Sequence, residues 1–212
     1  MSYKVVLCGR ANVGKTTLIM HMISGAKPQE NCKSTIGADF FSHKRQMEDG
    51  AEIRLQIWDT AGAERFQAMQ SFVFRDARAI VFVYDITNEE SFMAMETIVG
   101  EALQDVGPID PWVIIVGNKV DLAATDRAVA LAKATQRCKE LNYTLVETSA
   151  QDGTNVRQVL DMLCETIHER FGEKKPEGRE PRQTIARGKT IDLAAPPPPS
   201  GKQGPSKSAC EC

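Results

Sequence analysis

The sequence of 212 residues lacks several features that would assign it to common functional classes. It contains no apolar run long enough to span a membrane, which excludes a transmembrane helix. The first residues, MSYKVVLCGR, form a stretch too short and too polar for a signal peptide, and Ser2 stands where N-myristoylation requires glycine. The formal net charge of −2 excludes a general nucleic-acid binder, so we expect no nucleic-acid partner.

The sequence has six cysteines, and the spacing of four of them matches neither a metal site nor a disulfide framework. The scattered residues are Cys8, Cys32, Cys138 and Cys164. This distribution favours a reducing, cytosolic compartment. The remaining pair, Cys210 and Cys212, follows a different pattern that is considered below.

Short apolar runs alternate with segments of helical periodicity. The runs at 3–8, 54–58, 79–84, 112–117 and 143–148 are mostly rich in Val, Ile or aromatic residues and are typical of buried parallel strands. Helices are predicted over about 15–24, 65–75, 89–104, 125–141 and 155–171. This alternation predicts a doubly wound α/β sheet.

Two segments depart from the strand–helix alternation. Asp49-Gly50 lies between two extended runs within 39–58, which predicts a hairpin and therefore one antiparallel edge strand. Residues 173–212 include four consecutive prolines and hardly any large apolar side chains. Such a segment cannot bury enough surface to offset the entropy of ordering it, so we expect a folded domain over 1–172 and a disordered tail over 173–212.

The segment GRANVGKT, from Gly9 to Thr16, fits the G-x-x-x-x-G-K-[ST] pattern and lies between a predicted strand and a predicted helix. Backbone N–H groups of such a loop converge on phosphate oxygens, the lysine reaches the β- and γ-phosphates, and the final hydroxyl ligates Mg²⁺. A glycine-rich turn without a ligand is the structural alternative. We expect nucleoside triphosphate binding by Asn12, Val13, Gly14, Lys15, Thr16 and Thr17.

Two further motifs end predicted strands, where open α/β sheets bind ligands. NKVD spans Asn118 to Asp121, and its carboxylate can accept hydrogen bonds from N1–H and the 2-amino group of guanine, a pair of donors that adenine lacks. ETSA spans Glu147 to Ala150. Each motif by itself is also compatible with an ordinary polar turn. Together with the phosphate loop they predict a guanine-nucleotide site.

These motifs, in this order, resemble the Ras superfamily of small GTPases and, within it, the Rab family. Rab-like segments are IGADF (36–40), RLQIWDTAG (54–62), ERF (64–66), RDARA (75–79) and VYDIT (83–87). The resemblance implies the P-loop small-GTPase fold: a six-stranded, mostly parallel sheet with one antiparallel edge strand and helices on both faces. It also implies a GTP/GDP switch that recruits effectors to membranes in vesicle traffic.

The resemblance also implies roles for individual residues. Thr35 closes on Mg²⁺ and the γ-phosphate, Asp59 holds Mg²⁺ through water, and the Gly62 amide contacts the γ-phosphate. The residues implied around the base are Asn118, Lys119, Asp121, Ser149, Ala150 and Gln151. The residues implied at the reacting phosphate are Lys15, Thr35, Gly62 and the residue at position 63.

The sequence departs from the family at five positions. Ala63 replaces the glutamine that orients the attacking water, so we expect slow intrinsic hydrolysis. Asn12 replaces a loop glycine, and Val73 replaces a tyrosine of the effector-facing aromatic set. Pro28 and Cys32 occupy positions that generally hold aromatic residues near the nucleotide, so we expect faster nucleotide release.

The ending SACEC resembles the C-x-C ending of Rabs, in which both cysteines are geranylgeranylated. Two lipid chains anchor a protein stably whereas one anchors it marginally, so we expect Cys210 and Cys212 to hold the protein on the cytoplasmic face of an intracellular membrane, in exchange with the cytosol. Two unmodified exposed thiols are the alternative. The resemblance further implies an exchange factor, a GTPase-activating protein, a prenylation escort, a GDP-dissociation inhibitor, and effectors that contact residues 30–45 and 58–75.

Two other functions are compatible with parts of the pattern. Ala63 favours a largely non-hydrolysing, GTP-bound adaptor, whereas Lys15, Thr16 and Asp59 favour a cycling GTPase. A P-loop nucleoside kinase or ATPase is disfavoured by NKVD and by the lack of a second-substrate domain.

Overall fold

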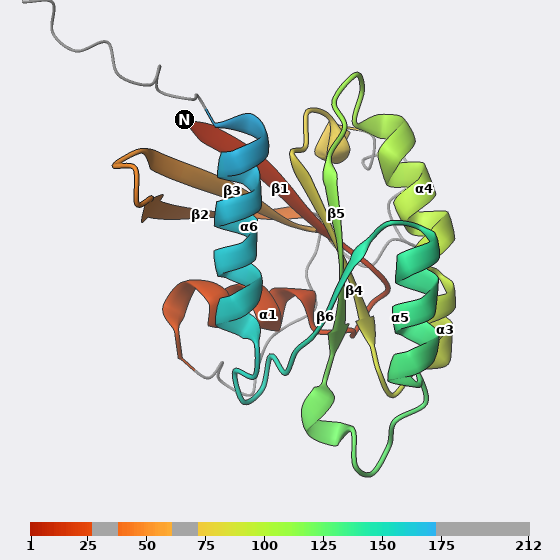
Figure 1. Cartoon of the computed structure of the whole chain (residues 1–212). Helices are drawn as coiled ribbons and strands as arrows, with labels where there is room; N and C mark the ends of the chain where they lie inside the picture. Colours follow the sequence, from red (N-terminus) through yellow and green to blue (C-terminus); the bar gives the residue numbers. More distant parts are fainter. Residues whose placement is uncertain (27–37, 61–71, 173–212) are drawn as a thin grey trace, which may run out of the picture. The chain divides into compact units, whose positions relative to one another are not determined.

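A six-stranded sheet forms the centre of the protein, in the order β2-β3-β1-β4-β5-β6 (Figure 1). The computed structural model describes residues 1–26, 38–60 and 72–172. The strands are β1 (Ser2–Cys8), β2 (Ala38–Gln46), β3 (Glu52–Thr60), β4 (Ala79–Asp85), β5 (Trp112–Asn118) and β6 (Thr144–Glu147). Neighbouring strands are parallel except β2, which pairs antiparallel with β3 at the edge. The predicted sheet and its antiparallel edge strand are confirmed.

The hairpin between β2 and β3 turns at the predicted Asp49-Gly50 pair. Gly50 has a φ of +79°, in the left-handed region that favours glycine. The Met47 N–H donates to the Ala51 carbonyl at 2.8 Å, and the Gly50 N–H donates to the Met47 carbonyl at 2.9 Å. These hydrogen bonds close the turn and fix the register of the edge strand.

Helices cover both faces of the sheet. They are α1 (Lys15–Ser24), α3 (Glu89–Met93), α4 (Met95–Asp105), α5 (Leu131–Glu140) and α6 (Val156–Phe171). Successive β1 side chains point to opposite faces: Val5 and Leu7 pack in the core under α1 and α6, whereas Val6 and Cys8 pack in the core under α3, α4 and α5 (Figure 1). β4 is buried along its whole length, as a parallel strand covered on both faces should be. None of the helices in the described ranges is long and apolar enough to cross a membrane.

Two helix predictions are wrong in detail. The single helix expected over 89–104 is divided at Ala94, which ends α3 and precedes α4. The helix expected over 125–141 begins only at Leu131, because the Ala128 and Val129 N–H groups both donate to the Ile86 carbonyl at 2.9 Å. Those N–H groups hold the chain against the end of β4, and Ala130 adopts extended geometry before the helix starts.

The predicted α1 boundaries are confirmed, and the other strand and helix boundaries shift by a few residues. Of the helix expected over 65–75, residues 65–71 lie outside the described part of the chain, and 72–74 are helical. The tail expected over 173–212 also lies outside it. Strands β1, β3, β4, β5 and β6 all run in one direction, so their carboxyl ends meet at one edge of the sheet, here named the carboxyl rim.

Candidate functional site

The loop from Gly9 to Gly14 connects the end of β1 to α1 and forms the first part of the carboxyl rim. Gly9 has a φ of +133° and Gly14 a φ of +96°. A Cβ atom on Gly9 would collide with the Val83 carbonyl, and one on Gly14 would collide with the Asn118 side-chain amide. Only glycine therefore permits this loop to approach β4 and β5 so closely. The loop leads directly into α1, so the N-terminal N–H groups of that helix face the concave side of the loop, where an anion can bind.

Asn12 also has a left-handed backbone, with a φ of +63°. Asparagine tolerates this conformation better than most residues do, which explains how it can replace a glycine here. Its side chain is exposed, so it adds hydrogen-bonding groups to the mouth of the loop without disturbing the core. Val13, by contrast, is buried and turns its carbonyl towards β5.

Lys15 is the buried cation of this loop. Its Nζ donates to the Gly9 carbonyl at 2.9 Å and to the Arg10 carbonyl at 3.0 Å, so the ammonium group lies inside the curve of the backbone. A cation held there, beside the first N–H groups of α1, makes a strong site for phosphate oxygens. Thr17, also in the first turn of α1, is half-buried.

Thr16 and Asp59 bring two oxygen ligands together. Thr16 Oγ1 donates to Asp59 Oδ2 at 2.5 Å, and the Asp59 side chain is fully buried at the end of β3. Among the described residues there is no cluster of three or more His, Cys, Asp or Glu side chains suited to a metal. A hydroxyl with one carboxylate still fits Mg²⁺, because that ion commonly takes one or two protein oxygens and completes its shell with phosphate and water.

The remaining residues expected at the reacting phosphate are Thr35, Gly62 and Ala63. All three lie outside the described residues, as do Pro28 and Cys32. The described part of the site therefore comprises the phosphate loop, the Thr16–Asp59 pair and the loops that follow β5 and β6.

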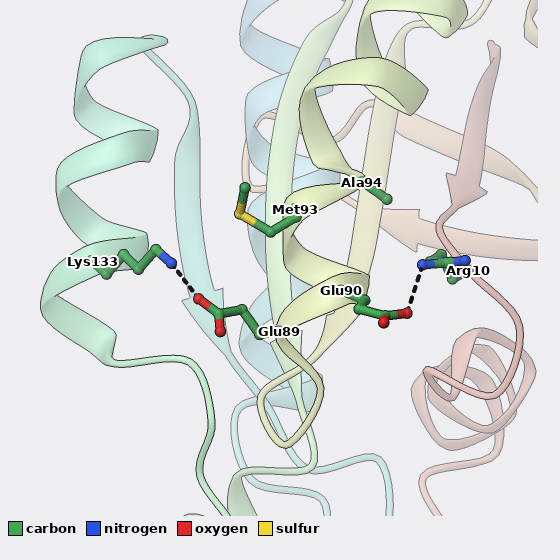
Figure 2. A pocket seen from close by; sticks show the side chains of 6 residues that line it. All are labelled: Arg10, Glu89, Glu90, Met93, Ala94 and Lys133. Atoms are coloured by element: carbon green, nitrogen blue, oxygen red, sulfur yellow. Dashed lines mark hydrogen bonds and ion pairs between the residues drawn. The ribbon is translucent and has the colours of Figure 1, made fainter.

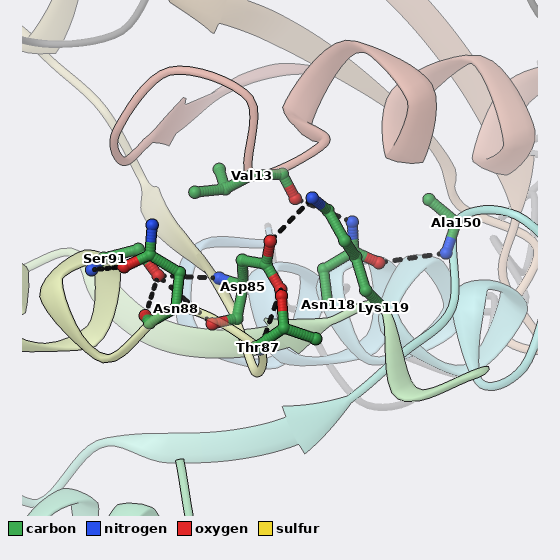
Figure 3. Close-up of polar contacts among 8 residues, drawn as sticks. All are labelled: Val13, Asp85, Thr87, Asn88, Ser91, Asn118, Lys119 and Ala150. Atoms are coloured by element: carbon green, nitrogen blue, oxygen red, sulfur yellow. Dashed lines mark hydrogen bonds and ion pairs between the residues drawn. The ribbon is translucent and has the colours of Figure 1, made fainter. Parts of the chain in front are cut away.

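Asn118, at the end of β5, joins the phosphate loop to the loop after β6 (Figure 3). Its Nδ2 donates to the Val13 carbonyl at 2.8 Å, and its Oδ1 accepts from the Ala150 N–H at 2.9 Å and from the Thr148 hydroxyl at 3.2 Å. The side chain is buried, and these contacts use both ends of the amide. Asn118 thus acts chiefly as a structural connection between two parts of the rim.

Asp121 and Ser149 form the second polar pair of the rim. The Ser149 hydroxyl accepts from the Gln151 N–H at 3.2 Å and the Asp152 N–H at 3.1 Å, and donates its proton to Asp121 Oδ1 at 2.6 Å. Since a serine hydroxyl has only one proton, the two N–H groups commit it to the carboxylate. Asp121 is exposed, so a carboxylate in a set orientation faces solvent beside the loop after β6.

Asp85 is a rim residue that the sequence analysis did not identify. Lys119 Nζ lies 2.6 Å from Asp85 Oδ2, and Thr87 donates to Oδ1 through its N–H at 2.8 Å and its hydroxyl at 2.7 Å (Figure 3). Burial favours a raised pKa for the Asp85 carboxyl, but the hydrogen bonds from Lys119 and Thr87 prevail and hold the pKa below its usual value. Asp85 pairs in register with Asn118, so an acidic residue ending the strand next to NKVD was the available signal.

His21 is a second residue that sequence reasoning missed. Its Nδ1 lies 2.9 Å from the Ala150 carbonyl. Because a carbonyl can only accept, Nδ1 carries the proton of this hydrogen bond. His21 therefore ties α1, the helix of the phosphate loop, to the loop after β6.

An open depression lies beside the rim, over α3 (Figure 2). It has a volume of about 590 Å³ and is lined by Arg10, Glu89, Glu90, Met93, Ala94 and Lys133. Arg10 pairs with Glu90 at 3.3 Å and Lys133 with Glu89 at 2.5 Å, so its charges are already matched. We assign no ligand to it.

Comparison with known proteins gives the family of the chain. Residues 4–169 match the family model described as the Ras family. The Ras-related protein Rab-7a of Paramecium octaurelia is 41% identical to the chain over 166 residues, which cover 76% of this chain and 79% of that protein. The range that matches the family model contains all the described rim residues but not Cys210 and Cys212.

Proposed function

The chain belongs to the Ras family of small GTPases, within it to the Rab proteins, and on this basis we propose that its carboxyl rim is the site of a GTP/GDP switch. The protein binds guanine nucleotide, hydrolyses GTP and acts in membrane traffic. The alternatives of a non-hydrolysing adaptor and of a kinase or ATPase are not favoured.

The Asn118 connection is the observation that carries the assignment. It holds the phosphate loop through Val13 and the loop of the base site through Ala150, so both halves of one nucleotide can be bound at a constant separation. Asp121 is proposed to accept from the guanine N1–H and 2-amino groups, and Lys119 to pack along the base. Preorganised groups of this kind lose little entropy when the ligand binds.

Mg²⁺ is proposed to bind to the Thr16 hydroxyl and, through water, to Asp59, with Thr35 joining in the GTP state. When bound, Mg²⁺ supplies charge neutralisation at the β- and γ-phosphates. Lys15 of this chain holds the phosphates electrostatically, and the N–H groups at the start of α1 orient them. The Gly62 amide is proposed to contact the γ-phosphate. Ala63 is proposed to leave the attacking water without a side-chain partner.

The nucleotide assignment can be tested with the purified full chain and fluorescent GDP. GDP is expected to displace the probe in the presence of Mg²⁺, whereas ADP is not. Adding EDTA should speed GDP release from the wild type but change release little in Thr16→Val, because that variant has already lost a metal ligand. Thr125→Val, which removes a hydroxyl from the exposed segment before α5, is the matched control. Equal displacement by ADP would contradict the guanine assignment.

Effector recruitment is proposed to use residues 30–45 and 58–75, of which 38–45, 58–60 and 72–75 are described. Phe40 and Phe72 are exposed, and Phe40 meets Trp58 edge to face at a centroid distance of 5.4 Å. Lys4 Nζ lies 4.9 Å from the Trp58 ring centroid and 5.8 Å from that of Phe72. Exposed aromatic side chains of this kind are typical of protein interfaces.

Val73 is buried, so it does not present a side chain where other Rabs often present tyrosine. We propose that the effectors of this chain therefore differ from those of Rabs with the full aromatic set. An exchange factor, a GTPase-activating protein, a prenylation escort and a GDP-dissociation inhibitor are the further proposed partners.

Membrane attachment is proposed to depend on geranylgeranyl groups on Cys210 and Cys212, at the cytoplasmic face of an intracellular membrane. Changing both cysteines to serine is expected to release the protein into the cytosolic fraction of cells. Single variants should attach reversibly, because one myristoyl-sized chain binds membranes with K of only about 10⁴ M⁻¹, and a longer isoprenoid holds somewhat better. Ser208→Ala is the control in the same segment. Persistent membrane fractionation of the double variant would point to a different anchor.

A further inference from the structure

Arg127 and Glu147 form a bidentate ion pair at the carboxyl rim, beside the loops that follow β5 and β6. Arg127 Nη1 donates to Glu147 Oε1 at 2.6 Å, and Nη2 donates to Oε2 at 2.9 Å. The Arg127 side chain is 22% exposed and that of Glu147 12%, so this pair is better shielded than the other arginine–carboxylate pairs of the described residues. Paired hydrogen bonds from one guanidinium impose a defined orientation as well as attraction.

The ion pair joins the two loops that carry Asp121 and Ser149. Arg127 lies where the chain returns from Asp121 to the sheet, and its Nη1 also donates to the Val129 carbonyl at 3.2 Å. Glu147 ends β6, two residues before Ser149, and its carbonyl accepts from the Asn155 side chain at 2.8 Å. The pair therefore closes a ring that runs from Asp121 through Arg127, Glu147 and Ser149 back to Asp121.

Within this ring, only the Ser149 hydroxyl contacts the Asp121 carboxylate in a described hydrogen bond. Asp121 is exposed, and the segment from 123 to 126 is mostly exposed as well, so core packing does little to restrain it. The distance between Asp121 and Ser149 then depends on the anchors at the ends of the two loops. The Val120 N–H donates to the Thr148 carbonyl at 3.0 Å and so links the two loops on the side that precedes Asp121. Arg127–Glu147 is a second direct link, and it lies on the side that follows Asp121 along the chain.

We infer that Arg127 and Glu147 are positioning residues for nucleobase selection: they hold the Asp121 carboxylate where it can accept from the 2-amino group of guanine. The inference rests on the proposed function, since it assumes that Asp121 reads the base. It concerns the fine position of one carboxylate and not the presence of the site. A positioning pair changes the preference between nucleotides, whereas a pair that only stabilises the fold would affect the binding of all nucleotides alike.

Inosine diphosphate provides the decisive comparison. Hypoxanthine keeps the N1–H and the carbonyl of guanine but lacks the 2-amino group. The ratio of the IDP and GDP dissociation constants therefore measures the contact between Asp121 and that amino group. Loss of folding stability changes both constants together and leaves the ratio unchanged.

The experiment measures this ratio for the full chain by competition with a fluorescent nucleotide. Arg127→Gln is expected to lower the ratio by about 10-fold, which corresponds to one displaced hydrogen bond to a charged group. Arg127→Lys keeps the positive charge but cannot donate two parallel hydrogen bonds to the carboxylate, so it should lower the ratio by a smaller factor. Exchanging the two residues, Arg127→Glu with Glu147→Arg, should restore part of it.

Arg137→Gln is the matched control. Arg137 also makes a two-pronged pair, donating to Glu96 at 2.8 and 2.6 Å, but it lies exposed on α5 and does not link the rim loops. Its ratio should equal that of the wild type. An unchanged ratio in both Arg127→Gln and Arg127→Lys would overturn the inference while leaving the guanine site intact. A wild-type protein that binds GDP and IDP equally would overturn the role of Asp121 and the inference with it.

Discussion

Asp121→Asn is expected to lower the affinity for GDP by about 100-fold or more and to create a preference for xanthine nucleotides. The carboxylate accepts from N1–H and the 2-amino group, whereas an amide presents a donor in place of one acceptor. Xanthine carries an oxygen where guanine carries the amino group, so the asparagine amide can donate to it. The Ser149 hydroxyl, which donates to Asp121 at 2.6 Å, can still donate to the amide oxygen and hold the new side chain in the same orientation.

Competition of GDP and XDP against a fluorescent nucleotide measures this exchange directly. Asp126→Asn is a suitable control, because Asp126 is an acidic residue of the same loop that accepts from Thr125 at 2.7 Å and has no assigned contact with the base. Its GDP affinity should match that of the wild type. Unchanged GDP affinity in Asp121→Asn would refute the assignment of Asp121 to the base.

Ala63→Gln is expected to raise the intrinsic single-turnover rate of GTP hydrolysis by about 10-fold or more, equivalent to lowering the barrier by ~1.4 kcal/mol. In small GTPases a glutamine at this position orients the attacking water, and a methyl group offers it neither a donor nor an acceptor. Phosphate binding through Lys15 and Mg²⁺ does not involve this side chain. The affinity for GTP should therefore change little while the chemical step accelerates.

Two further variants separate the causes of slow turnover. Ala63→Leu adds bulk without hydrogen-bonding groups and should leave the intrinsic rate low. Asn12→Gly tests the alternative that the Asn12 side chain crowds the phosphate loop. In the presence of an activating protein that supplies an arginine and a glutamine, wild type and Ala63→Gln should hydrolyse GTP at similar rates. If Ala63→Gln keeps the intrinsic rate of the wild type, the missing glutamine is not what limits hydrolysis.

Local sequence patterns predicted the elements whose boundaries depend on nearby residues. Gly14 and Gly25 border α1 with left-handed backbones, so the predicted bounds of that helix are confirmed. Patterning failed where distant contacts intervened. The apolar periodicity of 125–141 continues upstream of Leu131, yet hydrogen bonds to Ile86 keep 128–129 out of the helix. The apolar periodicity of 89–104 gave no sign of the break at Ala94, because Phe92 before it and Met95 after it are both buried.

The sequence by itself determined the fold class, the order of the motifs and the chemistry that each motif can perform. These properties follow from residue type and spacing: glycines for a tight loop, buried apolar runs for parallel strands, and polar residues at strand ends for a ligand site. The departure at Ala63 is likewise a property of the sequence, since its consequence follows from the absent side chain.

Only the tertiary structure decided which polar groups are partners. The Asn118 connection, the Asp85–Lys119 pair and the Arg127–Glu147 pair each join residues from different strand ends or the loops that follow them. Local periodicity cannot encode such pairs, because their geometry depends on how the strands are ordered in the sheet and on where each loop returns to it. Burial increases the free-energy contribution of these contacts, because a shielded charge or amide without a hydrogen-bond partner destabilises the fold.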